Sequence, residues 1–288
     1  MPLRPGRQGR QYPYGSKGRR KMSRINSLFQ SFAESGPALI AYATAGFPDL
    51  QTSYSIAAAL LRHCDALELG IPFSDPVMDG PVIQESSRRA LASGTKLREI
   101  LDMAGGLRTQ TEKPLMIMTY YNPVHRTGPA RFAAEAARAG IDAVLIPDLP
   151  PEEMAPWRKA AEAEGLSTVL FASMTTPDDR LRYLGRLTQG FLYCIAVKGT
   201  TGLRERLSGE LASFMGRVRS CCEVPLALGI GISSPEHCRE VAPLADGVVV
   251  GSALVKQCMD ALERGEDPAQ AAADLAERLK AALAVTEK

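Results

Sequence analysis

The chain has no apolar stretch that approaches the ~18 to 20 residues of a membrane-spanning helix. Its N-terminus also lacks the apolar core of a secretory signal peptide. Because both features are missing, we expect an unexported protein of the cytoplasm with no membrane partner.

The six cysteines form no C-x-x-C pair and stand in no Cys/His spacing typical of a metal site. We therefore predict no metal ion and a reduced compartment in which these thiols stay free. The adjacent pair Cys221 and Cys222 is interpreted as two ordinary thiols rather than a redox centre.

Acidic residues are missing from residues 1–21, which contain seven basic ones: Arg4, Arg7, Arg10, Lys17, Arg19, Arg20 and Lys21. Subtracting these seven from the chain's 34 Lys and Arg leaves 27 cations against 32 Asp and Glu, so residues 22–288 carry about −5. A basic arm can bind nucleic acid, but this one has neither ordered aromatic platforms nor a nucleic-acid-binding motif. We predict that residues 1–21 are a disordered basic extension and that nucleic acid is not a partner.

The rest of the chain has a globular composition, with 45% hydrophobic and 23% charged residues. Short apolar runs alternate with amphipathic segments, a pattern that predicts parallel strands wrapped in helices. The predicted strands are Ala38–Ala43, Ala66–Leu69, Leu115–Thr119, Ala143–Pro147, Thr168–Ala172, Phe191–Ile195, Leu226–Gly229 and Gly247–Val250.

Helical patterns fill the intervals between these runs. Leu97, Ile100, Leu101 and Ala104 have the spacing that seats a helix on a sheet. Proline and acidic residues predict helix starts at Pro129, at Pro150–Glu153 and at Pro177–Asp179. Eight alternating strands favour a closed (β/α)8 TIM barrel over an open sheet, so residues 22–288 are predicted to form one barrel domain.

Glu68 is the first candidate for catalysis, because it stands inside a short apolar strand between Leu67 and Leu69. Alternation sends it to the opposite face from both leucines, and we expect that face to point into the barrel. Burial raises the pKa of a carboxyl group and makes it a usable acid and base. A structural glutamate paired with a lysine or arginine of another strand explains the residue equally well.

Asp79 follows the same strand in a Met-Asp-Gly-Pro sequence. Asp-Gly is a common turn dipeptide, so the pattern alone favours a turn over a catalytic role.

A phosphate site is predicted after strands seven and eight, where barrels often bind phosphate. Gly229 and Gly231 follow strand seven, and Gly251-Ser252 follows strand eight, so backbone amides and a helix N-terminus can approach an anion there. After strand six, Gly199–Gly202 has the composition of a lid. Lys198 before it could form a Schiff base, although an exposed loop lysine is the simpler interpretation.

These segments resemble the tryptophan synthase α subunit family. The resemblance is strongest in LELGIPFSDPVMDGPVIQ and continues through MTYYNPV, LIPDLPPEE, GIGIS and GSALVK, covering about residues 22–280. It implies a lyase of the cytoplasm that splits indole-3-glycerol phosphate into indole and glyceraldehyde 3-phosphate for tryptophan biosynthesis.

The resemblance also implies roles for single residues. Glu68 would be the general acid and base at C3 of the indole, and Asp79 would bind the indole N–H. The matching substrate-binding positions are Tyr120, Asn122, Tyr193, Thr201, Gly202, Gly231, Gly251 and Ser252.

The implied partner is a β subunit, in a tetramer of two α and two β subunits. Pyridoxal phosphate would belong to that partner, and this chain would need no cofactor. Met78, Ala196 and Lys198 depart from the family pattern, in the partner-facing loop and in the lid. Three alternative hypotheses remain: a lyase that acts alone, a Schiff-base aldolase built on Lys198, and a non-catalytic nucleic-acid or scaffold protein that relies on the basic arm.

Overall fold

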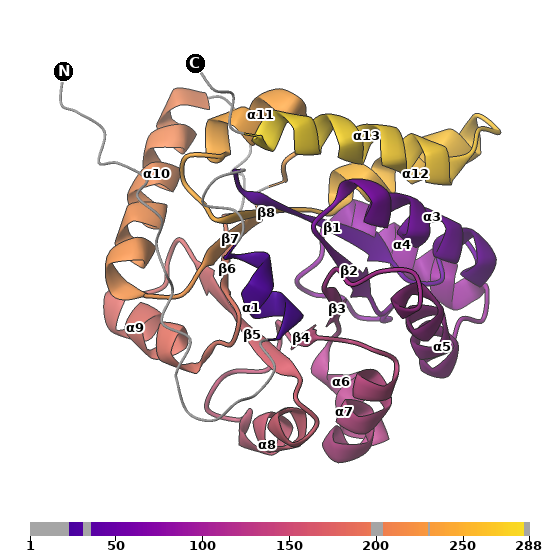
Figure 1. The fold of residues 1–288 in the computed structure, drawn as a ribbon, viewed down its shortest axis with the longest axis horizontal. Helices are drawn as coiled ribbons and strands as arrows, with labels where there is room; N and C mark the ends of the chain where they lie inside the picture. Colours follow the sequence, from indigo (N-terminus) through magenta and orange to yellow (C-terminus); the bar gives the residue numbers. More distant parts are fainter. Residues whose placement is uncertain (1–22, 31–35, 197–203, 230, 285–288) are drawn as a thin grey trace.

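The computed structural model describes residues 23–30, 36–196, 204–229 and 231–284. The predicted extension over residues 1–21 lies outside these ranges, as do Lys198, Thr201 and Gly202. Eight parallel strands pair in sequence order, and β8 pairs with β1 to close a barrel (Figure 1). They are β1 Ala38–Thr44, β2 Ala66–Gly70, β3 Leu115–Met118, β4 Ala143–Leu145, β5 Ser167–Ser173, β6 Leu192–Ile195, β7 Leu226–Gly229 and β8 Gly247–Val250.

The predicted TIM barrel is confirmed, and both ends of each predicted strand fall within two residues of the ends of the observed strand. Helices cover the outside of the barrel (Figure 1). They are α3 Leu50–His63, α4 Pro81–Ala92, α5 Leu97–Arg108, α6 Tyr121–Thr127, α7 Pro129–Arg138, α8 Ala155–Ala163, α9 Asp178–Leu187, α10 Arg204–Cys221, α11 Pro235–Val241, α12 Ser252–Glu263 and α13 Pro268–Leu283. A further short helix, α1 Arg24–Leu28, precedes β1 and does not belong to this outer layer.

Two of the three predicted helix starts are confirmed, and one is wrong. Helix α7 begins at Pro129, and α9 begins at Asp178 with Pro177 as its N-cap residue. Residues 150–153 form a turn, in which the Glu153 N–H donates to the Pro150 carbonyl at 3.0 Å. Helix α8 begins only at Ala155. A proline-rich segment suits a turn as well as the first turn of a helix, so the sequence did not distinguish the two.

The apolar core has an outer and an inner layer. Leu67 and Leu69 belong to the outer layer, between the barrel and its helices. Ala66, Met116 and Val249 belong to the inner layer, and α1 adds Ile25 to it. Figure 1 shows α1 lying across the end of the barrel. With that end filled, the carboxyl ends of the strands remain as the place for a site.

A repeated hydrogen bond ties the strands together at their amino ends. In each case a side chain that lies shortly before an even-numbered strand accepts a hydrogen bond. The donor is a backbone N–H at the start of the preceding odd-numbered strand. The four pairs, at 2.7 to 2.9 Å, are Asp65 with Leu39, Asp142 with Leu115, Gln189 with Thr168 and Asp246 with Leu226. Lys280, Arg108 and Arg219 form ion pairs with the three aspartates. These hydrogen bonds and ion pairs therefore stabilise the face of the barrel where the strands begin.

Asp142 is the most buried of the three aspartates, and its loss should be costly. Its carboxylate accepts from Arg108 at 2.8 Å and from Arg24 at 3.3 Å. Replacing Asp142 by Ala leaves the Leu115 N–H without its acceptor and removes one ion-pair partner from each arginine, so we expect the free energy of unfolding to fall by about 3 kcal/mol. Urea unfolding of Asp142→Ala measures the loss, and Asp102→Ala, which removes an exposed carboxylate 4.0 Å from Arg98, is the control. Equal stabilities of the two variants would contradict the assignment.

Candidate active site

Glu68 points into the barrel near the carboxyl end of β2. Its neighbours in the two adjacent strands are Tyr42 of β1 and Met116 of β3. Only 1% of Glu68 is exposed, while Leu67 and Leu69 on either side pack outward as alternation predicts.

Neither carboxylate oxygen of Glu68 has a hydrogen-bond partner among the described residues. The alternative of a structural glutamate paired with a lysine or arginine is therefore not supported by the described part of the chain. Burial, assisted by the negative charge of Asp79, raises the pKa of Glu68 to about 8. A protonated carboxyl group at neutral pH, held without a partner, is able to give a proton to a bound molecule.

Asp79 is held at the mouth of the barrel by Tyr120. The Tyr120 hydroxyl donates to Asp79 Oδ2 at 3.1 Å and accepts from the Met78 N–H at 3.0 Å. Gln84 donates to the Asp79 carbonyl at 2.8 Å, and Phe73 stacks on Tyr120 with ring centroids 5.2 Å apart. Burial raises the pKa of Asp79 to about 6, and the hydrogen bond from Tyr120 opposes that rise. Asp79 is thus a positioned carboxylate rather than a turn residue alone.

Two tyrosines face the carboxylates from other strands. Tyr193 of β6 packs against Phe171, with ring centroids 5.0 Å apart, and a Cβ on Gly229 would lie 2.8 Å from its ring. Burial first, and then the charge of Glu68, raises the pKa of Tyr193 well above its ordinary value. The same causes, with Asp79 ahead of Glu68, raise the pKa of Tyr42.

Tyr42 was not among the predicted site residues. It is 6% exposed, and its ring lies 3.4 Å from where a Cβ on Gly251 would be. A signal was present in the sequence, because alternation through Ala38, Ile40 and Tyr42 places the tyrosine on the inner face. The register of β1 and β2 pairs Tyr42 with Glu68, and this register is not encoded in either segment alone.

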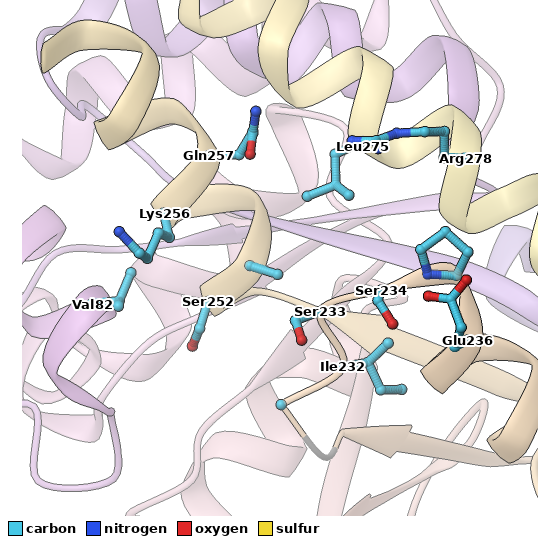
Figure 2. Close-up of a pocket in the computed structure, with 13 residues that line it drawn as sticks. Val82, Ile232, Ser233, Ser234, Glu236, Ser252, Lys256, Gln257, Leu275 and Arg278 are labelled. Carbon is cyan, nitrogen blue, oxygen red and sulfur yellow. The ribbon is translucent and has the colours of Figure 1, made fainter. Parts of the chain in front are cut away.

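The glycine turns after β7 and β8 line one groove of about 670 Å³ (Figure 2). Gly231, with φ +60°, and Ser233 approach it from the β7 side, and Ser252 approaches from the first turn of α12. Ser234 caps α11 by accepting the His237 N–H at 3.3 Å. Of the predicted residues, Gly231 and Ser252 line this groove, and Gly251 is the N-cap residue of α12 directly before Ser252.

Asn122 lies apart from the carboxylates. It is exposed in the first turn of α6 and lines a second groove of about 640 Å³ that also contains Phe73 and Pro123. Tyr120 belongs to the site because its hydroxyl donates to Asp79, whereas Asn122 lies at the outer rim of the site. The predicted lid residues Thr201 and Gly202 lie outside the described residues.

In the described ranges no group of three or more His, Cys, Asp and Glu side chains could hold a metal ion. All six cysteines are free, and five of them are buried. Every helix described is too short or too polar to cross a bilayer.

Comparison with known proteins gives one consistent result. The family described as tryptophan synthase alpha chain matches residues 28–284. The chain is 48% identical to the tryptophan synthase alpha chain of Geobacter sp. (strain M21) over 237 residues, which are 82% of this chain and 89% of that protein. Identity to the alpha chain of Neisseria meningitidis serogroup B is 40% over 238 residues, 82% of this chain and 91% of that one.

Solved structures agree. Tryptophan synthase subunit alpha from Legionella pneumophila superposes with a TM-score of 0.84 at 33% identity, covering 91% of this chain and 99% of that one. A chain of M. tuberculosis tryptophan synthase, in an aminoacrylate- and BRD0059-bound form, gives a TM-score of 0.83 at 30% identity, with 92% and 100% covered.

Proposed function

This chain belongs to the tryptophan synthase alpha chain family, and we propose that it splits indole-3-glycerol phosphate into indole and glyceraldehyde 3-phosphate with Glu68 and Asp79 as its catalytic carboxylates. The observation that carries the assignment of residues is the Glu68 carboxyl group, which is buried, has no hydrogen-bond partner among the described residues and is subject to the negative charge of Asp79. The proposal includes the catalytic roles of these two carboxylates and the roles of the substrate-binding residues.

The reaction begins with a proton transfer. Protonated Glu68 gives its proton to C3 of the indole ring, which becomes an iminium-like electron sink. Asp79, ionised, accepts the indole N–H and stabilises the positive charge that develops on the nitrogen.

The carbon–carbon bond then breaks as in a retro-aldol reaction. Its electron pair returns to the ring, while the hydroxyl on the departing carbon becomes an aldehyde and loses its proton. Glu68, now a carboxylate, is the group placed to take that proton, so it ends the cycle protonated as it began. The raised pKa of Glu68, about 8, suits both halves of this exchange.

The remaining residues bind the substrate. Gly231, Gly251 and Ser252 present backbone amides and the start of α12 to the phosphate. The rings of Tyr120 and Tyr193 flank the indole and glycerol portion, Asn122 stands at the rim, and Thr201 with Gly202 supplies a closing lid.

We propose that the indole passes to a β subunit in a tetramer of two α and two β subunits in the cytoplasm. Each step on this chain is a proton transfer or an electrostatic contact, so the chain itself uses no cofactor, and pyridoxal phosphate belongs to the partner. Val77 and Met78, 78% and 56% exposed, are apolar side chains on the loop that carries Asp79, which supports this loop as a contact with the partner.

Indole release by the purified chain, with and without a β subunit, tests the proposal. We expect slow turnover of indole-3-glycerol phosphate alone and at least a roughly tenfold increase with the partner, because coupling between sites commonly reaches that size. Full activity without any partner would instead support a lyase that acts alone. A folded chain that is inactive under both conditions would contradict the reaction. Borohydride in the presence of substrate should trap no adduct, and a covalent adduct at Lys198 would favour the aldolase.

A further inference from the structure

The groove at the glycine turns extends well beyond what a phosphate needs. Its volume is about 670 Å³, whereas a phosphoryl group replaces only a few waters of about 30 Å³ each. Ser233 and Ser252 lie at one end, and Lys256, Gln257 and Arg278 lie farther out on α12 and α13 (Figure 2). Charged side chains of α12 and α13 therefore line the part of the groove that lies away from the two serines.

Two cations, Lys256 and Arg278, and one anion, Glu236, are among the residues that line the groove. Lys256 stands one turn after Ser252 on the same face of α12, and its Nζ lies 2.8 Å from Asp260, which offsets much of its charge. Glu236 is likewise offset by Arg239 at 3.3 Å. Arg278 differs from both: within the described ranges its hydrogen-bond partner is the Asp274 carbonyl, which accepts from Nε at 3.2 Å and leaves the guanidinium charge intact.

A negative charge at the site opposes the approach of a phosphate. Asp79 lies at the mouth of the barrel, so an arriving phosphate dianion meets a carboxylate of its own sign. A concave surface concentrates the field of the charges that line it. An unneutralised cation on the phosphate side of the mouth would offset that repulsion and would direct the dianion toward the glycine turns.

We propose that Arg278, with a smaller contribution from Lys256, is a specificity-determining residue that captures the phosphate of the substrate by long-range attraction before it reaches Gly231 and Ser252. The inference rests on the proposed function and adds a residue that no predicted motif contains. Arg278 does not touch the reacting atoms, so it governs KM and its dependence on salt, and it discriminates a phosphorylated indole glycerol from a neutral one.

Charge reversal at Arg278 tests this. At ~20 mM ionic strength we expect Arg278→Glu to raise KM for indole-3-glycerol phosphate about tenfold and to change kcat less than twofold. In ~0.5 M NaCl the difference in KM should shrink to less than twofold, because salt screens charges of the surface. Arg278→Lys keeps the charge and should keep a KM within about twofold of the original. Lys159→Glu makes the same change of net charge on α8, away from the groove, and should leave KM unaltered.

The outcomes separate this inference from the lyase assignment. Calorimetry with glycerol 3-phosphate measures phosphate binding without any turnover, and we expect Arg278→Glu to weaken it about tenfold at low salt. An affinity equal to that of the unaltered chain would overturn the inference even if the lyase is active. An equal loss in Lys159→Glu would overturn it too, since net charge would then be the cause. If the unaltered chain binds glycerol 3-phosphate but releases no indole, the lyase assignment fails while the role of Arg278 is still decided.

Discussion

Replacing Glu68 by Gln should lower kcat for indole release about 10³-fold or more, because one side chain both gives and takes the proton. Glutamine has nearly the same shape and fills the same buried position, but it can neither protonate C3 nor accept the hydroxyl proton. Binding of glycerol 3-phosphate, measured by calorimetry, should be nearly unchanged. Glu240→Gln, an exposed position on α11, is the matched control. Turnover within tenfold of the unaltered chain would exclude Glu68 as the acid.

The same variant has a second signature, in stability. The pKa of Glu68 rises from an ordinary value near 4.5 to about 8 on folding, because the folded protein disfavours its charged form. Ionisation of Glu68 therefore destabilises the folded state increasingly as pH rises from about 4.5 to about 8. Glu68→Gln removes this penalty, so its thermal midpoint should match that of the original chain at pH 5 and exceed it at pH 8. A variant that is inactive and less stable at both pH values would indicate misfolding instead.

Much of this site was predictable because alternation is a local rule. The inward direction of Glu68 follows from Leu67 and Leu69 alone, and the eight strands follow from their apolar runs. Which residues meet across a closed barrel is a property of the whole chain. For this reason no pattern showed that Glu68 has no hydrogen-bond partner in the described part of the chain, or that Tyr42 of the adjacent strand β1 is its neighbour.

Loops and helix ends were less predictable for a different reason. Proline at residues 150–151 suits a turn and a helix start equally, and only the packing of α8 decides between them. Asp79 shows the same ambiguity, since an Asp-Gly turn and a catalytic carboxylate have the same local sequence. The hydrogen bond from Tyr120, 41 residues away, distinguishes the two in the structure.

Replacing Asp79 by Asn should lower kcat about 10²-fold or more, because the ring nitrogen loses the negative charge that stabilises its positive one. Asp75→Asn, which alters an exposed carboxylate of the same loop, is the control and should change kcat less than twofold when the chain is assayed alone. An Asp79→Asn variant that keeps a third of the original kcat would exclude this electrostatic role.

The pH profile identifies the two carboxylates separately. Asp79 acts while ionised and its pKa is about 6, so activity should rise as pH increases through 6. Glu68 acts first as an acid and its pKa is about 8, so activity should fall as pH increases through 8. The unaltered chain should thus show a bell-shaped profile of kcat/KM with its maximum near pH 7. Because a side-chain amide does not titrate, Asp79→Asn should lose the rise near pH 6. The fall should remain but move somewhat below pH 8, since the negative charge of Asp79 no longer helps to raise the pKa of Glu68. If the rise near pH 6 persists in the variant, another group is responsible for it and Asp79 does not act as the ionised carboxylate.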